Sequence, residues 1–150
     1  MNSSINDAED PSINYSNLLV GNPISRRSYV VDRELVRLYK LAVQDKSKLL
    51  TTGSDISKVP LAPPMSISAL SLRGVVNDLK IPGGTLHVGQ ETEYKKPVAI
   101  GETLHCEATV SSNNVRGEWR FMGVELKVTD SKGDIVMNGK STILLPVKSE

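Results

Sequence analysis

The stretch that decides the fold is MSISALSLRGVVNDL, residues 65–79. Apolar residues recur along it at helical spacing, on one face at Met65, Ala69, Leu72, Val76 and Leu79. A second apolar face carries Ile67, Leu70 and Val75, and most of the remaining residues are serine or glycine. A helix that is apolar nearly all round belongs inside a protein, so this pattern predicts a helix enclosed by other elements. Pro82-Gly83-Gly84 is expected to end it.

Four stretches after this helix alternate apolar and polar residues, which is the pattern of half-buried strands. They span residues 86–94, 103–110, 122–128 and 135–145. Turn-forming sequences separate them at residues 97–101, 111–117 and 130–134. One buried helix followed by a run of antiparallel strands predicts an α+β fold, in which a curled antiparallel sheet wraps around the central apolar helix.

Three further parts are expected ahead of the helix. Residues 1–24 are rich in Ser, Asn, Asp and Pro without sustained periodicity, which predicts a flexible N-terminal arm before a single domain over residues 25–150. Asp32 is a good helix N-cap, and the next helix is expected to bury a face made of Leu35, Leu38, Tyr39 and Ala42. Residues 45–64 have no periodicity and contain several prolines, so they predict a loop or lid.

The composition argues against several classes of function. The 150 residues, 39% hydrophobic and 23% charged, are those of one ordinary globular domain. A net charge of +1 gives no reason to expect nucleic acid or an anionic membrane as a partner. No apolar run approaches the roughly 20 residues that span a bilayer, and the N-terminus has no signal pattern. Cys106 is the only cysteine and no Cys/His spacing indicates zinc, so we expect a cytoplasmic protein without metal or cofactor.

The most specific stretch follows the helix and is LHVGQETEYKKPVAIGETL, residues 86–104. It resembles the MaoC-like hot-dog family of dehydratases and hydratases, in which a strand ends in aromatic-x-x-Pro and a tight Gly-Asp/Glu turn leads to the next long strand. Ala62-Pro63-Pro64-Met65, just ahead of the helix, is similar to the amino-terminal-domain, non-catalytic branch of these proteins. The resemblance covers residues 29–146. It implies a hot-dog fold and an acyl-CoA or acyl carrier protein thioester as substrate.

The same resemblance implies a set of site residues. In catalytically complete members, the first helix runs into Gly-Asp-x-Asn-Pro-x-His, whose Asp and His hold a water, and a backbone N–H at the start of the buried helix binds the oxyanion. Asp45 falls on the acidic position and is the candidate catalytic residue, with two other readings open: a vestige of the site, or a polar residue that only ends the helix. Leu50 falls where the histidine belongs. Pro64 falls on the oxyanion donor and has no N–H. The acyl group is expected to contact Tyr39, Leu50, Pro63, Pro64, Met65 and Ala69.

Other reactive side chains are interpreted as structural. His87 and His105, the only histidines, lie in expected strands rather than at the signature. Cys106 lies on an apolar strand face, which favours an inert core thiol over a nucleophile. Tyr94 is expected to be a packing aromatic rather than an acid.

Three functional hypotheses follow. In the first, the chain is the half of an (R)-specific enoyl-thioester hydratase, or 3-hydroxyacyl-thioester dehydratase, that shapes the acyl pocket and lacks the full signature. In the second it is an active homodimeric enoyl-CoA hydratase, and in the third a hot-dog acyl-CoA thioesterase or binding protein. All three predict a homodimer or a heterodimer with a catalytic hot-dog subunit, because an isolated hot-dog sheet exposes an edge strand. Leu50 in place of the histidine and Pro64 in place of the oxyanion donor favour the first hypothesis.

Overall fold

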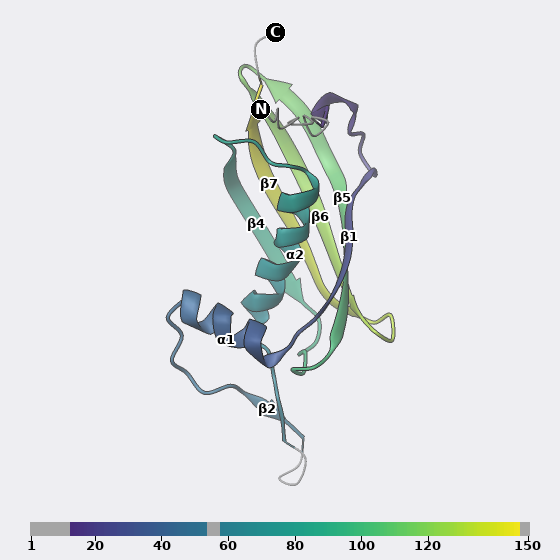
Figure 1. Ribbon diagram of the computed structural model, residues 1–150. Coiled ribbons are helices and arrows are strands. Elements are labelled where there is room, and N and C mark those ends of the chain that lie inside the picture. Colours follow the sequence, from purple (N-terminus) through teal and green to yellow (C-terminus); the bar gives the residue numbers. More distant parts are fainter. Residues whose placement is uncertain (1–12, 54–57, 148–150) are drawn as a thin grey trace, which may run out of the picture.

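The computed structural model describes residues 13–53 and 58–147. Along the chain, these residues form a short 3-10 helix, two α-helices and seven strands (Figure 1). In order, the elements are η1 (Tyr15–Asn17), β1 (Pro23–Val30), α1 (Arg33–Ala42), β2 (Thr51–Thr52), β3 (Val59–Pro60), α2 (Pro64–Asp78), β4 (Leu86–Tyr94), β5 (Thr103–Arg116), β6 (Trp119–Asp130) and β7 (Ile135–Pro146).

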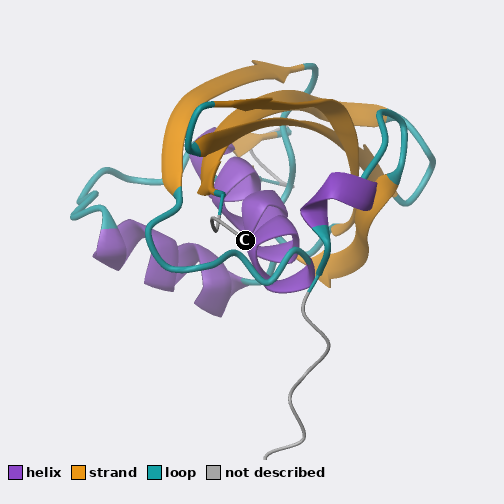
Figure 2. Cartoon of the chain, turned by 90° about the horizontal axis from the view of Figure 1, so that it is seen from above, coloured by secondary structure: helices purple, strands orange, loops and turns teal. Residues whose placement is uncertain are grey.

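Five of these strands form one antiparallel sheet in the order β1-β5-β6-β7-β4. The sheet curls over α2, which runs along its concave side (Figure 2). β2 and β3 form a separate two-stranded pair in the segment between the two helices. The expected α+β hot-dog fold, a curled antiparallel sheet around a central helix, is therefore confirmed.

The two sides of the sheet follow from alternation in the sequence. In β5 the apolar residues Leu104, Cys106, Ala108 and Val110 are all buried, whereas the residues between them are half-buried or exposed. Leu104, Cys106 and Ala108 belong to one hydrophobic cluster that also contains Ile67, Val75 and Leu79 of the helix and its end. Burial of this apolar surface, at roughly 25 cal/mol per Å², is the main contribution that holds the sheet on the helix.

α2 begins and ends one residue earlier than periodicity predicts. Pro64 stands at its first position, where the N–H that proline lacks would have no partner within the helix. The serines on its inner side are buried but bonded, since Ser66 Oγ donates to Pro63 O at 2.6 Å and Ser71 Oγ to Ile67 O at 2.7 Å. A serine-rich helix can therefore lie inside the sheet without unpaired hydroxyls.

One face of α2 differs from the expected full enclosure. Met65 is 54% exposed, Val76 is 50% exposed, and Ala69 lies on the same outer face. The sheet covers only one side of the helix, and the opposite side stays open in the single chain (Figure 2).

Asp32 caps α1 as predicted, and its Oδ1 accepts a hydrogen bond from Leu35 N at 2.7 Å. The predicted apolar face is misplaced, because Val36 is the buried residue of this helix while Leu38 is 50% exposed. α1 lies beside the sheet and α2 rather than between them (Figure 2). It contacts the core along one flank only, and spacing within the helix does not reveal which flank that is.

β5 is longer than the sequence predicts. A turn was expected over residues 111–117, but the strand continues to Arg116 and the chain turns at Gly117, whose φ is 59°. A bulge between Val110 and Ser112 precedes this extension. Asn113, one of the residues that suggested a turn, instead donates from Nδ2 to the carbonyls of Tyr15 and Leu18, both at 2.8 Å.

Residues 13–24 lie against the domain, where the sequence predicted part of a flexible arm. Tyr15 Oη donates to Leu79 O at 2.8 Å and to Lys80 O at 3.0 Å, so it satisfies carbonyls at the end of α2. Leu18 and Ile24 pack against the core. Residues 1–12 of the predicted arm lie outside the described residues.

Candidate functional site

A cavity lies at the start of α2, between the segment that follows α1 and the loop that follows β4. This first cavity has a volume of about 480 Å³, within the range usual for small-molecule pockets. Its polar rim carries Lys40, Asp45, Ser47, Lys48, Lys95 and Lys96. Its walls are mainly apolar and are formed by Leu49, Leu50, Leu61, Ala62, Pro63, Pro64, Ile67, Tyr94, Pro97 and Val98.

A wider hollow of about 710 Å³ lies over the outer face of the sheet. Oppositely charged residues stand across from each other there, with Glu107 opposite Lys127 and Glu125 opposite Lys140. Such cross-strand pairs stabilise a sheet by themselves and need no ligand to explain them. The apolar cavity at α2 is therefore the candidate site.

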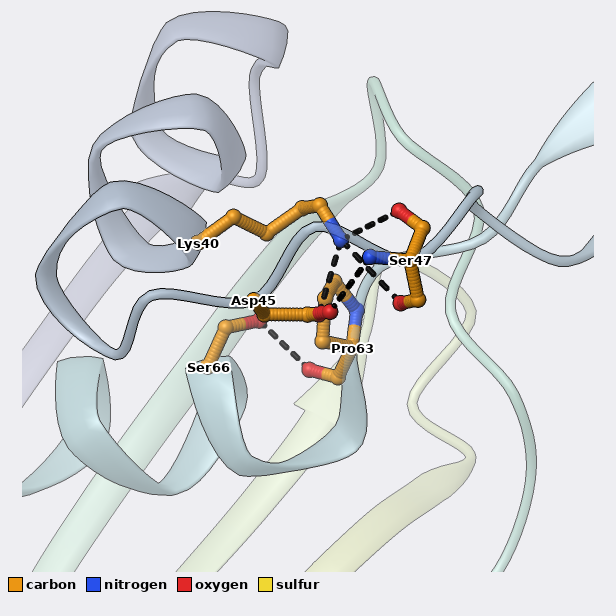
Figure 3. Close-up of polar contacts among 5 residues, drawn as sticks. All are labelled: Lys40, Asp45, Ser47, Pro63 and Ser66. Atoms are coloured by element: carbon orange, nitrogen blue, oxygen red, sulfur yellow. Dashed lines mark hydrogen bonds and ion pairs between the residues drawn. The ribbon is translucent and has the colours of Figure 1, made fainter.

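Asp45 lies on the rim of the first cavity and is fully engaged there. Its Oδ2 accepts from Lys40 Nζ at 2.7 Å, and its Oδ1 accepts from Ser47 N at 2.8 Å (Figure 3). Lys40 Nζ also donates to Ser47 O at 2.8 Å, so the ammonium closes the loop that follows α1. Hydrogen bonds from Lys40 and Ser47 hold the pKa of Asp45 well below its usual range. A carboxylate in this state is a weak base and is poorly suited to activate water.

Leu50, which the resemblance aligns with the family's histidine, lines the first cavity and is 77% exposed. Neither histidine of the chain replaces it. His105 Nδ1 lies 2.7 Å from Ser28 Oγ, on the outer side of β5, and His87 lies at the opposite end of α2. The first cavity therefore has no imidazole that could exchange a proton with a substrate.

Pro63 and Pro64 both line the first cavity. Pro63 is the N-cap of α2 and Pro64 follows it at the first helical position. Ser66 N donates to Pro63 O at 2.9 Å, and Ser66 Oγ donates to the same carbonyl (Figure 3). Proline carries no amide hydrogen, so the first helical residue offers no donor to an oxyanion in this cavity.

Three of the residues expected to contact an acyl group do not line the first cavity. Met65 and Ala69 lie on the open outer face of α2. Tyr39 is half-buried on α1, where burial raises its pKa. Asp45, Leu50, Pro63 and Pro64 are the expected residues that the structure brings together.

Lys40 and Tyr94 also line the first cavity, and the sequence did not predict either of them there. Lys40 stands in the last turn of α1, five residues before Asp45. The two side chains can meet at this spacing only because the chain folds back after the helix. Tyr94 ends β4 and reaches α2, where its Oη lies 2.8 Å from Ser68 Oγ. Basic residues are favoured in the last turn of a helix, next to its unpaired carbonyls, and this could have pointed to Lys40. Nothing in the sequence near Tyr94 indicates its contact with Ser68.

Two other reactive groups lie away from the first cavity and are also engaged. Asp78 Oδ2 accepts from Ser25 Oγ at 2.6 Å and from Arg27 Nε at 3.1 Å, and Arg27 is the main reason that its pKa is lowered. Cys106 is 7% exposed, and burial raises the pKa of its thiol. Within residues 13–53 and 58–147, no three His, Cys, Asp or Glu side chains are grouped so that they could hold a metal ion.

A family model described as FAS1-like, dehydratase domain region, matches residues 18–139. The chain belongs to this family. The match runs from the segment before β1 into β7, so it includes both the Asp45 loop and the start of α2. The resemblance to the MaoC-like hot-dog dehydratases is thereby confirmed.

Individual relatives agree with this family. An (R)-specific enoyl-CoA hydratase of Rhodospirillum rubrum is 31% identical over 70 residues, which are 46% of this chain and 46% of that relative. The alignment thus spans less than half of the curated relative. The solved structure of R-hydratase PhaJ1 from Pseudomonas aeruginosa has a TM-score of 0.73 at 20% identity, over 89% of this chain and 86% of that one.

A second solved structure is the C-terminally truncated HadBC complex, a 3R-hydroxyacyl-ACP dehydratase from Mycobacterium tuberculosis. Its TM-score is 0.66 at 21% identity, over 83% of this chain and 96% of that one. Likeness at these identities supports the fold. The described helices include none that is both long and apolar enough to cross a membrane.

Proposed function

We propose that this member of the dehydratase family is the non-catalytic subunit of an (R)-specific enoyl-thioester hydratase or 3-hydroxyacyl-thioester dehydratase. It pairs with a catalytic hot-dog subunit and supplies walls of the pocket that holds the acyl chain. The relevant substrate is an acyl-CoA or acyl carrier protein thioester.

The arrangement around Asp45 is the observation that carries this proposal. Hydration adds a hydroxyl to C3 of the enoyl group and a proton to C2, so a base must take a proton from water and an acid must return one. Here the aspartate is bonded to Lys40, Leu50 stands where the histidine belongs, and Pro64 removes a donor for the thioester oxyanion. The apolar cavity remains, while the groups that would perform the reaction in it are missing or occupied.

The first cavity is suited to an acyl chain because its walls offer apolar contact. Ile67, Leu61 and Val98 contribute to those walls, and Lys48 and Lys95 stand at the rim, where an anionic carrier would lie. The solved HadBC structure is itself a complex of two different chains, which is the kind of assembly proposed here.

A hydration assay with crotonyl-CoA and longer enoyl-CoA substrates tests the proposal. The purified chain is measured alone, with a candidate catalytic hot-dog subunit, and as Asp45→Asn in the same complex. Turnover is expected only in the complex, and it should persist in Asp45→Asn but vanish when the partner's own signature histidine is replaced. Turnover by the isolated chain that Asp45→Asn abolishes would overturn the proposal.

A second candidate is an active homodimeric enoyl-CoA hydratase. The 31% identity to an (R)-specific enoyl-CoA hydratase favours it. It requires a proton-transfer group other than histidine in the first cavity, and Asp45 freed from Lys40 is the one available carboxylate among the described lining residues. The same assay separates the two candidates, because the homodimer needs no second kind of subunit.

A further inference from the structure

A second apolar cavity lies along the other half of α2, beside β4 and β7. Its volume is about 360 Å³, and its apolar lining includes Leu72, Val75, Val76, Ile81, Val124 and Ile143. Two of its polar residues already have partners, since Ser141 Oγ donates to Gln90 Oε1 at 2.5 Å and Thr85 Oγ1 to Pro82 O at 2.8 Å. His87 is the remaining polar side chain of the lining, and the rest of it suits a hydrocarbon.

The two cavities lie on the same helix and are close together. Ile67 lines the first cavity and Leu72 lines the second. Five residues of α-helix correspond to about 7.5 Å along the axis, or about 1.4 turns, and the two residues face about 140° apart around the helix.

Ser68 lies between these two positions on α2, and Tyr94 reaches it from the end of β4. Tyr94 Oη lies 2.8 Å from Ser68 Oγ, so the phenol reaches from β4 to α2. Ser68 is 2% exposed, and its hydroxyl also donates to Met137 Sδ at 3.3 Å. Met137 is the residue of β7 that pairs with Tyr94 of β4. The ring is therefore held between helix and sheet, while Tyr94 also lines the first cavity.

We propose that Tyr94 sets the length of acyl chain that this subunit accepts, by closing the first cavity off from the second. This inference rests on the proposed acyl-pocket function. A chain that enters the first cavity gains contacts with each added methylene until its end meets the phenol ring. Without the ring, a longer chain continues along α2 into the second cavity.

Binding of saturated acyl-CoAs, from butanoyl- to hexadecanoyl-CoA, to the purified chain tests this by calorimetry. Each buried methylene contributes about 0.8 kcal/mol, or roughly fourfold in affinity. The affinity of the wild-type protein should rise with chain length by about that factor and then level off. In Tyr94→Ala the rise should continue to longer chains by at least two methylenes, roughly 16-fold in affinity for the longest added chain.

Two further variants separate the proposed gate, which is the Tyr94 ring between the two cavities, from general effects of mutation. Thr92→Ala truncates a side chain of the same strand that lines neither cavity, and it should level off at the wild-type length. Val76→Trp is designed to fill the second cavity, which Val76 lines from a position that is 50% exposed. Combined with Tyr94→Ala, it should return the limit to the wild-type length, and thermal melts confirm that each variant is folded.

The outcomes distinguish failure of the gate from failure of the acyl-pocket role. If acyl-CoAs bind and the limiting length is the same in wild type and Tyr94→Ala, the gate is refuted while the acyl pocket stands. A longer limit that Val76→Trp does not reverse also refutes it, because the added length then lies elsewhere. If no acyl-CoA binds to the wild-type chain, either alone or with a catalytic subunit, the acyl-pocket role fails and the gate falls with it.

Discussion

Replacement of Tyr29 by phenylalanine tests how firmly β1 is bound to α2. Tyr29 Oη lies 3.2 Å from Ser71 Oγ and donates to Ile67 O at 3.4 Å. Ser71 keeps its own bond to Ile67 O in the variant, so no hydroxyl is left unpaired there. We expect the free energy of unfolding at neutral pH to fall by about 1 kcal/mol, the usual net contribution of such a hydrogen bond.

The effect of this substitution should reverse at alkaline pH. Burial raises the pKa of Tyr29 to about 12 from an ordinary value of 10.0. Above the ordinary pKa the unfolded chain releases the phenolic proton while the folded chain keeps it, so wild-type stability falls as pH rises toward the folded pKa. One unit of pKa corresponds to about 1.4 kcal/mol, so wild type loses about 1.4 kcal/mol by pH ~11, and phenylalanine does not. Tyr29→Phe should then be the more stable protein by about 0.4 kcal/mol.

Urea unfolding of both proteins at a series of pH values measures this difference directly. Lysine and other tyrosine titrations occur in both proteins and cancel in the comparison, because the rest of the chain is the same. If the difference in the free energy of unfolding between wild type and variant stays constant from neutral pH to pH ~11, the account of Tyr29 as a buried, hydrogen-bonded phenol is refuted.

Three other perturbations follow from individual contacts. Lys40→Met removes the main cause of the low pKa of Asp45, so that pKa should rise toward its ordinary value of 3.8. The stability that the wild-type protein loses only at very low pH should then be lost at a higher pH in the variant. An NMR titration that shows no rise in the pKa of Asp45 would contradict this. Gly74→Ala would place Cβ 2.9 Å from Ser25 Oγ and should lower the unfolding free energy by about 1–3 kcal/mol, whereas Gly83→Ala, with nothing within 4 Å, should be nearly neutral in thermal melts. Asp32→Ala should cost about 1 kcal/mol by loss of the N-cap and Asp32→Asn much less, and equal losses in chemical denaturation would exclude the cap as the cause.

Much of the fold could be predicted because it depends on short-range patterns. The spacing of apolar residues over 65–79 predicted α2 to within one residue at each end, and alternation in β5 predicted its buried side. Prediction failed where a neighbour decides the outcome. Residues 111–117 looked like a turn, but pairing with β6 and the bonds from Asn113 to the N-terminal segment keep residues 111–116 in a strand.

The candidate site was predictable to a similar degree. Asp45, Leu50, Pro63 and Pro64 were recognised from their order in the chain, and the structure gathers them around one cavity. Met65 and Ala69 were placed there by the same reasoning but lie on the outer face of α2, because a helix turns neighbouring residues in different directions.

What the sequence determined by itself is the set of groups that are present and missing. A carboxylate at Asp45, an aliphatic side chain at Leu50 and a backbone nitrogen without hydrogen at Pro64 are facts of residue identity and hold for any path of the chain. The tertiary structure alone decided what surrounds them. Lys40 bonds to Asp45, and Tyr94 meets Ser68 from a strand 26 residues away, because a curled sheet brings separate elements together. Those contacts depend on the path of the backbone through space, which local spacing does not contain.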